Sequence, residues 1–526
     1  MSSGNFWEIF YKNFLHTEKI YGILYTLQYP VWEDNTMRKI TAILLLMSML
    51  LSVTACGSAD TAETTADTAA QTETVEETEE TRAMHEVPEL DFGGEEFRIL
   101  YPTWQGYLYY FFADEENGDA MNDAIFTRTI RVEEYLNVDI VKEDTGGVQH
   151  EQISQMAGMI TKAVTAGDDL YDMTLLHCIS AVSDMATTGM LYNLDNLPHI
   201  NMEADWWNRT QMDVLRLGQN TYFGVNDFMI PCPYAVFFNK GMIADNNMEN
   251  PYDLVYEGKW TLDTMIDMAV DITRDLNGDG QHTEEADVYG MSAPEVSKYA
   301  SFVIGSNQYL TSRDESGKIY LDCNTEKMYS LVETIYKAAN NPGTIFMPAG
   351  EPEINQFDFD SGRLLFRLDT IANAVLFREY ESDIGILPYP KFDEAQENYI
   401  SLDWGGLMCV PVTIQETDMV GAVLELLAYE SGDTVIPAYY DVLLAGKLSR
   451  DEDSRNMIDI LFDTIAYEVG CNYFGFTPGF NELFFAMSQL VIVQKSTDYA
   501  SWYAKYEKQA AQAIDKLYTA LEKIEG

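Results

Sequence analysis

A run of oxygen-bearing side chains separated by glycines, Asp275-Leu276-Asn277-Gly278-Asp279-Gly280, has the spacing of a calcium-binding loop. Oxygens at alternate positions suit a hard cation, and Gly280 suits the sharp turn of such loops. The twelfth position holds Ala286, where an EF-hand has a bidentate glutamate. Glu284, Glu285 or Asp287 would then take the place of that glutamate, with altered geometry.

The spacing therefore predicts a structural Ca²⁺ ion, with ligands drawn from Asp275, Asn277, Asp279, Gln281 and Asp287. The alternative is a solvated turn between a helix and a strand at residues 288–290, since Asn-Gly and Asp-Gly pairs favour turns. We favour the calcium interpretation, with the ion serving stability only.

The patterns of histidine, serine and cysteine predict no catalytic centre. The sequence has no H-E-x-x-H, G-x-S-x-G or G-x-x-x-x-G-K-[ST] motif. Its six cysteines include no C-x-x-C pair, so we expect no zinc site, mostly buried free thiols and at most two disulfides. Carboxylate pairs are too numerous in so acidic a chain to mark a glycosidase dyad. We expect no enzymatic activity.

Length and charge narrow the class of protein further. A chain of 526 residues with 47% hydrophobic residues builds two or three domains with substantial cores. The formal net charge of −53 repels nucleic-acid phosphates and anionic membrane surfaces, and it favours solubility. A nucleic-acid function is therefore excluded.

The segment from Met37 to Cys56 resembles a bacterial lipoprotein signal peptide. Basic residues open it, an apolar run covers 40–53, and Val53-Thr54-Ala55-Cys56 has the small residues of a lipobox. The resemblance implies cleavage before Cys56 and lipid attachment to its thiol. The apolar run is shorter than the about 20 residues that a membrane-spanning helix needs.

The segments on either side of this signal fit an exported, anchored protein. We interpret residues 1–36 as an extension upstream of the true start codon at Met37. Residues 57–88 consist mainly of Ala, Thr, Ser, Asp, Glu and Gln, which cannot bury enough apolar surface to fold. We therefore predict a disordered tether that holds a folded body at the extracellular face of the membrane.

From about residue 90 the sequence alternates between strand and helix patterns. We predict strands at 96–101, 138–140 and 171–176, separated by helices at 122–136 and 152–166. Farther on we predict a strand at 235–238, a helix capped by Thr261 and a C-terminal helix at 499–524. This alternation indicates an α/β fold with a largely parallel sheet, in which ligands bind beyond the carboxyl ends of the strands.

Five segments carry a family resemblance: NDAIFTRTIRVEEYLNVDI at 122–140, WW at 206–207, PYAVFFNK at 233–240, NPYDLVYEGKWTLD at 250–263 and DIGILPYPKFDEAQENY at 383–399. In this order they resemble the extracellular solute-binding proteins of ABC importers, of the carbohydrate-binding lipoprotein type of Gram-positive bacteria. The resemblance covers nearly all of the chain from residue 90 onward. It implies a two-lobed α/β fold of the periplasmic-binding-protein-like type II, with lobes joined by chain crossings and ligand held between them.

Carried onto this sequence, the resemblance implies lobe 1 at 89–231 and 383–410, and lobe 2 at 232–382 and 411–526. The first crossing falls near residues 231–235. Residues 383–390 return to lobe 1 as a strand, and the helices from about residue 415 complete lobe 2.

A sugar-binding cleft needs flat aromatic side chains against C–H faces and carboxylates or amides beside hydroxyl groups. Candidates for stacking are Trp104, Trp206, Trp207, Tyr234, Trp404 and Tyr473, and candidates for hydroxyl recognition are Asp172, Asn226, Asp227, Asp369 and Asp403. We select those beside predicted strand ends or crossings, Trp104, Tyr234, Asp403 and Trp404, followed by Trp206 and Asp369. A core or surface position is the alternative for each, and Trp260 is assigned to the core.

The sequence thus predicts a lipid-anchored monomer that captures a carbohydrate, in particular an oligosaccharide, and delivers it to the membrane subunits of an ABC permease. Two alternatives remain open: a surface glycan-binding lipoprotein without a transport role, and a carbohydrate-active enzyme. A polar ligand other than a sugar also remains open.

Overall fold

The computed structural model divides after Arg82, and every described residue lies between Ala83 and Gly526. The described residues are 83–101, 111–144, 150–176, 182–283, 286–293, 297–346, 359–403, 406–444, 452–475 and 477–525. The predicted extension, the signal peptide with Cys56 and the tether up to Arg82 lie outside them. Within the described residues, no helix combines the length and the apolar character needed to cross a bilayer.

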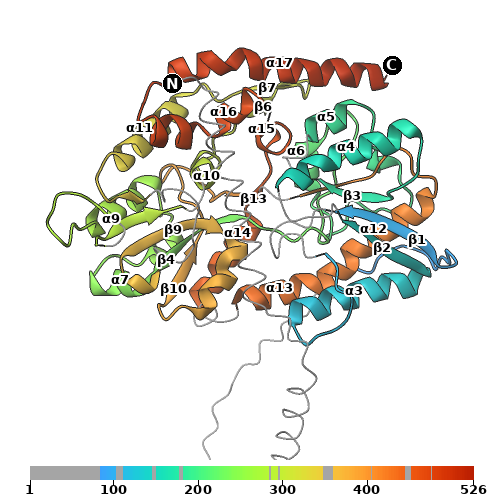
Figure 1. Ribbon diagram of the computed structural model, residues 1–526, viewed down its shortest axis with the longest axis horizontal. Coiled ribbons are helices and arrows are strands. Elements are labelled where there is room, and N and C mark those ends of the chain that lie inside the picture. Colours follow the sequence, from blue (N-terminus) through green and yellow to red (C-terminus); the bar gives the residue numbers. More distant parts are fainter. Residues whose placement is uncertain are drawn as a thin grey trace, which may run out of the picture. The chain divides into compact units, whose positions relative to one another are not determined.

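The first lobe contains a four-stranded sheet in the order β12-β3-β1-β2, and β1, β2 and β3 are labelled in Figure 1. Its strands are β1 (Glu95–Tyr101), β2 (Val138–Asp144), β3 (Met173–Leu176) and β12 (Leu407–Cys409). β1 runs parallel to both of its neighbours, and β12 runs antiparallel to β3. Helices α3 (Ala120–Leu136) and α4 (His150–Ala166) connect the parallel strands, as the alternating pattern predicted.

The caps of α3 show why the helix has these bounds. The Asp119 carboxylate accepts hydrogen bonds from the backbone N–H groups of Met121 and Asn122, which have no partner within the helix. At the other end Asn137 takes a left-handed conformation with φ of 50°, which ends the helix and lets β2 begin one residue later.

The second lobe contains a five-stranded sheet in the order β10-β4-β9-β5-β8. Its strands are β4 (Tyr234–Asn239), β5 (Tyr289–Ser292), β8 (Ile345–Phe346), β9 (Leu364–Thr370) and β10 (Ile384–Leu387). The helices between these strands are α7 (Lys240–Asp245), α8 (Pro251–Tyr256), α9 (Leu262–Ile272), α10 (Ser297–Gly305), α11 (Glu326–Ala339), η4 (Phe359–Ser361) and η5 (Ile371–Glu379). Thr261 caps α9 as predicted, accepting a hydrogen bond from the Thr264 N–H.

The core of this lobe forms around Trp260, which is fully buried as predicted. Its ring lies 5.6 Å from that of Phe366 on β9, and its Nε1–H donates to the Pro388 carbonyl oxygen at 2.9 Å. The hydrogen bond satisfies the polar atom of a large side chain that would otherwise be costly to bury.

The remaining elements join or cover the two sheets. They are α5 (Val182–Thr187), η3 (Leu194–Asn196), α6 (Arg209–Leu215), β6 (Thr311–Arg313), β7 (Ile319–Leu321), β11 (Ser401–Leu402), α12 (Thr417–Asp433), α13 (Val435–Leu444), α14 (Glu452–Asp463), β13 (Ile465–Ala466), α15 (Val469–Asn472), α16 (Phe480–Phe484), the π-helix η7 (Met487–Val493) and α17 (Tyr499–Glu525). β6 pairs with β7, and β11 pairs with β13. The long helix α17, red in Figure 1, packs against α5, α16 and β7.

Two segments of chain carry the backbone from one sheet to the other, and they lie side by side. Residues 225–233 lead into β4, and they overlap the predicted crossing at 231–235. The chain between Asp403 and Gly406 connects β11 to β12. Pro233 forms an antiparallel bridge with Asp403, and Gly224 forms another with Met408. The two crossings therefore form one paired connection and not two independent linkers.

The predicted return to lobe 1 at residue 383 is wrong for the first part of that segment. β10 pairs antiparallel with β4, so it belongs to the five-stranded sheet, and only β12 lies in lobe 1. All four residues of β10 are buried, and an apolar run of this kind does not indicate which sheet a strand joins. Gly385 allows the fit, because a Cβ there would lie 2.1 Å from Cε1 of Phe238 on β4.

The prediction that all helices after residue 415 complete lobe 2 is also wrong. α12 packs against α3 of lobe 1, where Arg131 and Glu430 form an ion pair of 3.0 Å. α13 contacts both α3 and η5, and α14 contacts β10 of lobe 2. The chain after β12 thus serves both lobes, because each helix buries its apolar face against whichever surface is nearest.

Candidate ligand-binding site at the chain crossings

A pocket of about 410 Å³ lies beside the paired crossings. It is lined by the loop that leads into α6 (residues 203–210), by the first crossing (residues 225–231), and by Asp403, Ile465 and Tyr467 near the β11-β13 pair. A volume of this order falls within the range of small-molecule sites, which often form between domains.

One buried carboxylate fixes the aromatic wall of the pocket. Glu425 on α12 is fully buried and accepts hydrogen bonds from the indole N–H groups of Trp206 at 2.9 Å and Trp207 at 2.7 Å. The backbone N–H of Asn201 also donates to it at 3.1 Å. Burial raises the pKa of Glu425, and the three hydrogen bonds oppose that rise because they favour the ionised form.

The two tryptophans have different positions. Trp207 lines the pocket, whereas Trp206 does not. Trp206 is 2% exposed, and its ring packs edge-on against Tyr429 with the ring centroids 5.0 Å apart. Both indoles are buried, since Trp207 is only 3% exposed, and only Trp207 belongs to the pocket lining, so the selected candidate Trp206 has a core position.

Asp403 lines the pocket and is held by the pairing of the crossings. Its carboxylate is buried and accepts a hydrogen bond from the backbone N–H of Cys232 at 3.1 Å. Burial raises the pKa of the adjacent Cys232 thiol to about 12, so that thiol stays protonated at neutral pH. Ligand binding by Asp403 stays a prediction.

Asn226 is one of the lining residues, and its amide carries a buried donor. Its side chain is 5% exposed, and its Oδ1 accepts a hydrogen bond from the Phe228 N–H. Its Nδ2 is buried and has no hydrogen-bond partner among the described residues. An unsatisfied buried donor costs free energy, so this amide is suited to an acceptor atom that a ligand supplies.

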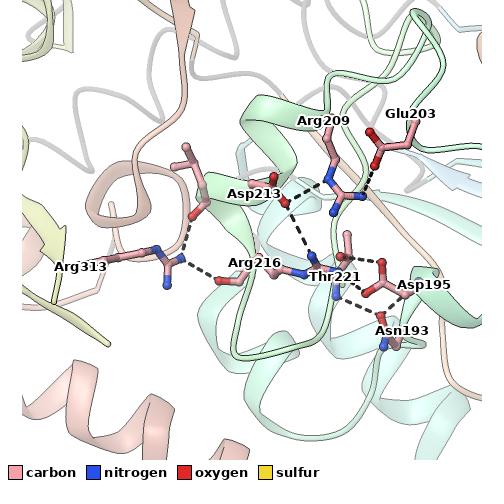
Figure 2. Close-up of polar contacts among 9 residues, drawn as sticks. Asn193, Asp195, Glu203, Arg209, Asp213, Arg216, Thr221 and Arg313 are labelled. Atoms are coloured by element: carbon pink, nitrogen blue, oxygen red, sulfur yellow. Dashed lines mark hydrogen bonds and ion pairs between the residues drawn. The ribbon is translucent and has the colours of Figure 1, made fainter. Parts of the chain in front are cut away.

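A network of ion pairs holds the loop and helix that form one side of the pocket (Figure 2). Arg209, a lining residue, contacts Glu203 at 3.4 Å and Asp213 at 3.1 Å. Arg216 pairs with Asp195 at 2.7 Å, and Arg313 of β6 donates to the carbonyl oxygens of Val214 and Arg216. These last bonds satisfy carbonyl groups at the end of α6, which lack partners within the helix.

Gln211 of α6 ties the helix to the β13 side of the pocket. Its Nε2 donates to the Ile465 carbonyl at 2.6 Å, and its Oε1 accepts from the Tyr467 N–H at 2.9 Å. These two bonds fix the backbone on either side of Ala466, so Tyr467 is positioned as the second aromatic residue of the lining.

Tyr234 and Asp369, both selected from the sequence, come together away from this pocket. Asp369 is fully buried at the end of β9 and pairs with Arg367 at 3.0 Å, while Lys298 lies 3.8 Å away. The Lys298 Nζ sits 4.9 Å from the centroid of the Tyr234 ring. Neither Tyr234 nor Asp369 lines the pocket, and the cluster holds the start of β4 against the end of β9.

Other candidates have structural partners or lie outside the described residues. Trp104 and Trp404 are outside them. Asp172 pairs with Arg98 at 2.9 Å, and the Tyr473 hydroxyl donates to the Leu215 carbonyl, so both support the fold. Of the wider candidate set, Trp207, Asn226 and Asp227 do line the pocket.

The lining also contains residues that the sequence reasoning missed. They are Glu203, Asp205, Arg209 and Tyr467. The clusters Asp205-Trp206-Trp207-Asn208 and Asn226-Asp227, with acids or amides beside aromatic residues, are the signal that would have favoured these segments. Tyr467 carries no such signal, because its position depends on the pairing of β13 with β11.

In the predicted calcium loop, side-chain oxygens accept hydrogen bonds from backbone N–H groups of the same loop. The two oxygens of Asp275 accept from the N–H groups of Gly278 and Gly280 at 2.7 and 2.8 Å. Asp279 accepts from the Gln281 N–H, and Asp287 accepts from Leu276 and Thr283. The bond from the Thr283 N–H lowers the pKa of Asp287, so it stays ionised.

Within the described residues, no three His, Cys, Asp or Glu side chains are grouped so as to hold a metal ion. Glu284 and Glu285 lie outside them. Calcium binding by Asp275, Asn277, Asp279, Gln281 and Asp287 therefore stays a prediction.

Solved structures share this fold. The ABC substrate-binding protein Lmo0181 from Listeria monocytogenes, in complex with cycloalternan, matches with a TM-score of 0.52 and 12% identity, over 82% of this chain and 99% of that one. The galacto-N-biose-/lacto-N-biose I-binding protein of an ABC transporter from Bifidobacterium longum, in complex with lacto-N-biose, matches with a TM-score of 0.52 and 11% identity. That match covers 82% of this chain and 98% of the other.

Comparisons of the sequence with protein families and with curated proteins find no match. The structural matches confirm the predicted fold class. The chain has the two-lobed α/β fold of ABC substrate-binding proteins, the periplasmic-binding-protein-like type II.

Proposed function

We propose that this chain is the extracellular, lipid-anchored substrate-binding protein of an ABC transporter. In this proposal it captures a carbohydrate between its lobes and delivers it to the membrane subunits of a permease. The observation that carries the proposal is the pocket at the crossings, with Trp207 and Tyr467 beside carboxylates and the unpartnered Asn226 amide. Proteins of the same fold, named above, were solved in complex with sugars.

The chemistry of the lining supports a sugar ligand. A pyranose ring offers apolar C–H faces to aromatic side chains and hydroxyl groups around its rim. The carboxylates of Asp205, Asp227 and Asp403 accept hydrogen bonds from hydroxyl hydrogens, and Asn226 donates to a hydroxyl or ring oxygen. Such a lining is suited to bind and orient a sugar.

The location of the pocket supports a mechanism of lobe closure. The crossings, which bridge at Pro233 and Asp403, are where a change in a few backbone angles would turn one lobe relative to the other. Ligand held against Asp403 and the first crossing favours the closed arrangement by the difference in its affinity for the two states. The permease then distinguishes loaded from empty protein by this difference in shape.

The test is a thermal-shift and calorimetric screen of neutral mono- and oligosaccharides against the chain and a Tyr467→Leu variant. We expect one or more sugars to raise the melting temperature, since a ligand that binds only the folded state stabilises it. Loss of the aromatic contact should weaken binding about tenfold, the effect of about 1.4 kcal/mol.

The control is Tyr320→Leu, because Tyr320 is 45% exposed on β7 and does not line the pocket. This variant should bind as the parent chain does. If no sugar shifts the melting temperature, or if both variants weaken binding equally, the carbohydrate assignment at this pocket is wrong. Release of a cleaved sugar would instead support the alternative of a carbohydrate-active enzyme.

A further inference from the structure

The charged side chains of the pocket are mainly acidic. Four carboxylates line it, those of Glu203, Asp205, Asp227 and Asp403, against the single guanidinium of Arg209. That guanidinium is already paired, to Glu203 at 3.4 Å and to Asp213 at 3.1 Å. The formal charge of the described lining is thus −3 (four acids, one base), and no unpaired cation of this lining faces an incoming anion.

The donor and acceptor groups show the same imbalance. Asn226 supplies one buried donor, Nδ2, which finds no acceptor among the described residues although its side chain is only 5% exposed. An ionised carboxylate can accept hydrogen bonds but cannot donate one. A matching ligand therefore presents one acceptor to Asn226 and several donors to the acids.

Burial strengthens the electrostatic effect of the acidic side chains on a ligand. Asp403 is 2% exposed, so its charge is less screened by water than that of an exposed acid. Asp205 is an exposed residue of the lining and acts on a ligand as it approaches, whereas Arg209 offsets the charge of Glu203. A carboxylate or phosphate on a sugar would enter against both groups of charges, whereas a protonated amine would be attracted by both.

We propose that the pocket selects amine-bearing sugars over the matching neutral sugars and rejects sugars that carry a carboxylate. This inference rests on the proposed function and defines the class of carbohydrate that the same site binds. Asn226 donates to a hydroxyl or ring oxygen, and Asp205, Asp227 and Asp403 surround the ammonium group.

The test uses matched sugar triples with the full chain, at a mildly acidic pH where the amines are protonated. Each triple contains a neutral sugar, its 2-amino form and its uronate. Three triples are used, those of glucose, galactose and mannose. We expect the 2-amino form of at least one series to bind about tenfold tighter than the neutral form, and the uronate not to bind. Added salt should reduce the preference, since it screens the charges.

Asp205→Asn removes one charge from the opening and should reduce the preference for the amine about threefold in this assay. Asp263→Asn is the matched control, because Asp263 is an exposed acid at the start of α9 and does not line the pocket. This control should leave all affinities unchanged.

The outcomes separate the two proposals. If a neutral oligosaccharide binds but no 2-amino sugar binds more tightly than its neutral partner, the inference fails and the proposed function stands. If a uronate binds tightly, the inference likewise fails and the proposed function stands. If no sugar of any kind binds, the proposed function fails, and the inference fails with it.

Discussion

At the scale of single residues, Glu425 supports the pocket from behind, because it does not line the pocket but holds residues that do or that lie next to it. It joins α12 to both tryptophans and to Asn201 through three hydrogen bonds, all inside the protein. A lone buried carboxylate would be costly, and here the donors that surround it offset the cost of its desolvation. Glu425 therefore fixes the position of Trp207 in the pocket lining.

Glu425→Gln should destabilise the fold by about 1–3 kcal/mol, because an amide accepts from one indole but turns a second donor toward the other. Urea unfolding measures the loss, and tryptophan fluorescence should change with it. Glu416→Gln is the control, since Glu416 is exposed at the start of the same helix and makes no capping bond. Equal stability of the two variants would show that Glu425 does not hold the tryptophans.

The raised pKa of Glu425 has a defined effect on stability. Between its ordinary value of 4.5 and the higher value in the folded state, the folded protein binds more protons than the unfolded chain. The free energy of unfolding contributed by this group therefore falls as pH rises through that range. The stability difference between the parent chain and Glu425→Gln should shrink from pH 4.5 upward, and parallel curves would contradict this account.

At the scale of elements, the close packing of β10 against β4 requires a residue without a side chain at position 385. Gly385→Ala would place a methyl carbon 2.1 Å from the Phe238 ring and 2.6 Å from the Tyr252 hydroxyl. We expect this overpacking to destabilise the protein by about 1–3 kcal/mol in denaturant unfolding. Gly158→Ala, in α4 with no atom within 4 Å, should be neutral or stabilising by about 0.5–1 kcal/mol. A neutral Gly385→Ala would mean that β10 does not lie against β4 as described.

The loop at 275–287 tests the calcium prediction separately from the sugar site. Calcium should raise the melting temperature of the parent chain, and Asp279→Ala should abolish that rise. Asp263→Ala, on the exposed side of the preceding helix, should keep it. Identical melting of the parent chain with calcium and with a chelator would refute the site.

Element types were predictable from the sequence because their signals are local. The Thr261 cap, the alternation from β1 to β3 and the buried Trp260 all follow from spacing within one segment. Which sheet a buried strand joins is decided by distant contacts, so 384–387 was placed in the wrong lobe. Asp403 was selected because it flanks a crossing, and it lines the pocket, whereas Tyr234 and Asp369 contact Lys298 and do not line the pocket.

At the scale of the whole molecule, function depends on the joining of two sheets at one place. The pocket takes residues from the first lobe and from both crossings, so a ligand in it contacts the segments that would move on closure. Neither lobe alone contains this lining. In the proposed mechanism, ligand affinity and lobe closure are two parts of one equilibrium.

Hydrogen exchange with and without the sugar that binds best tests the central claim most directly. The account predicts slower exchange at 203–210 and 225–231, because ligand contact and closure suppress local opening there. The loop at 275–287 should exchange at an unchanged rate, since it does not line the pocket. Protection confined to other segments, or no protection at saturating sugar, would contradict a binding site at the chain crossings.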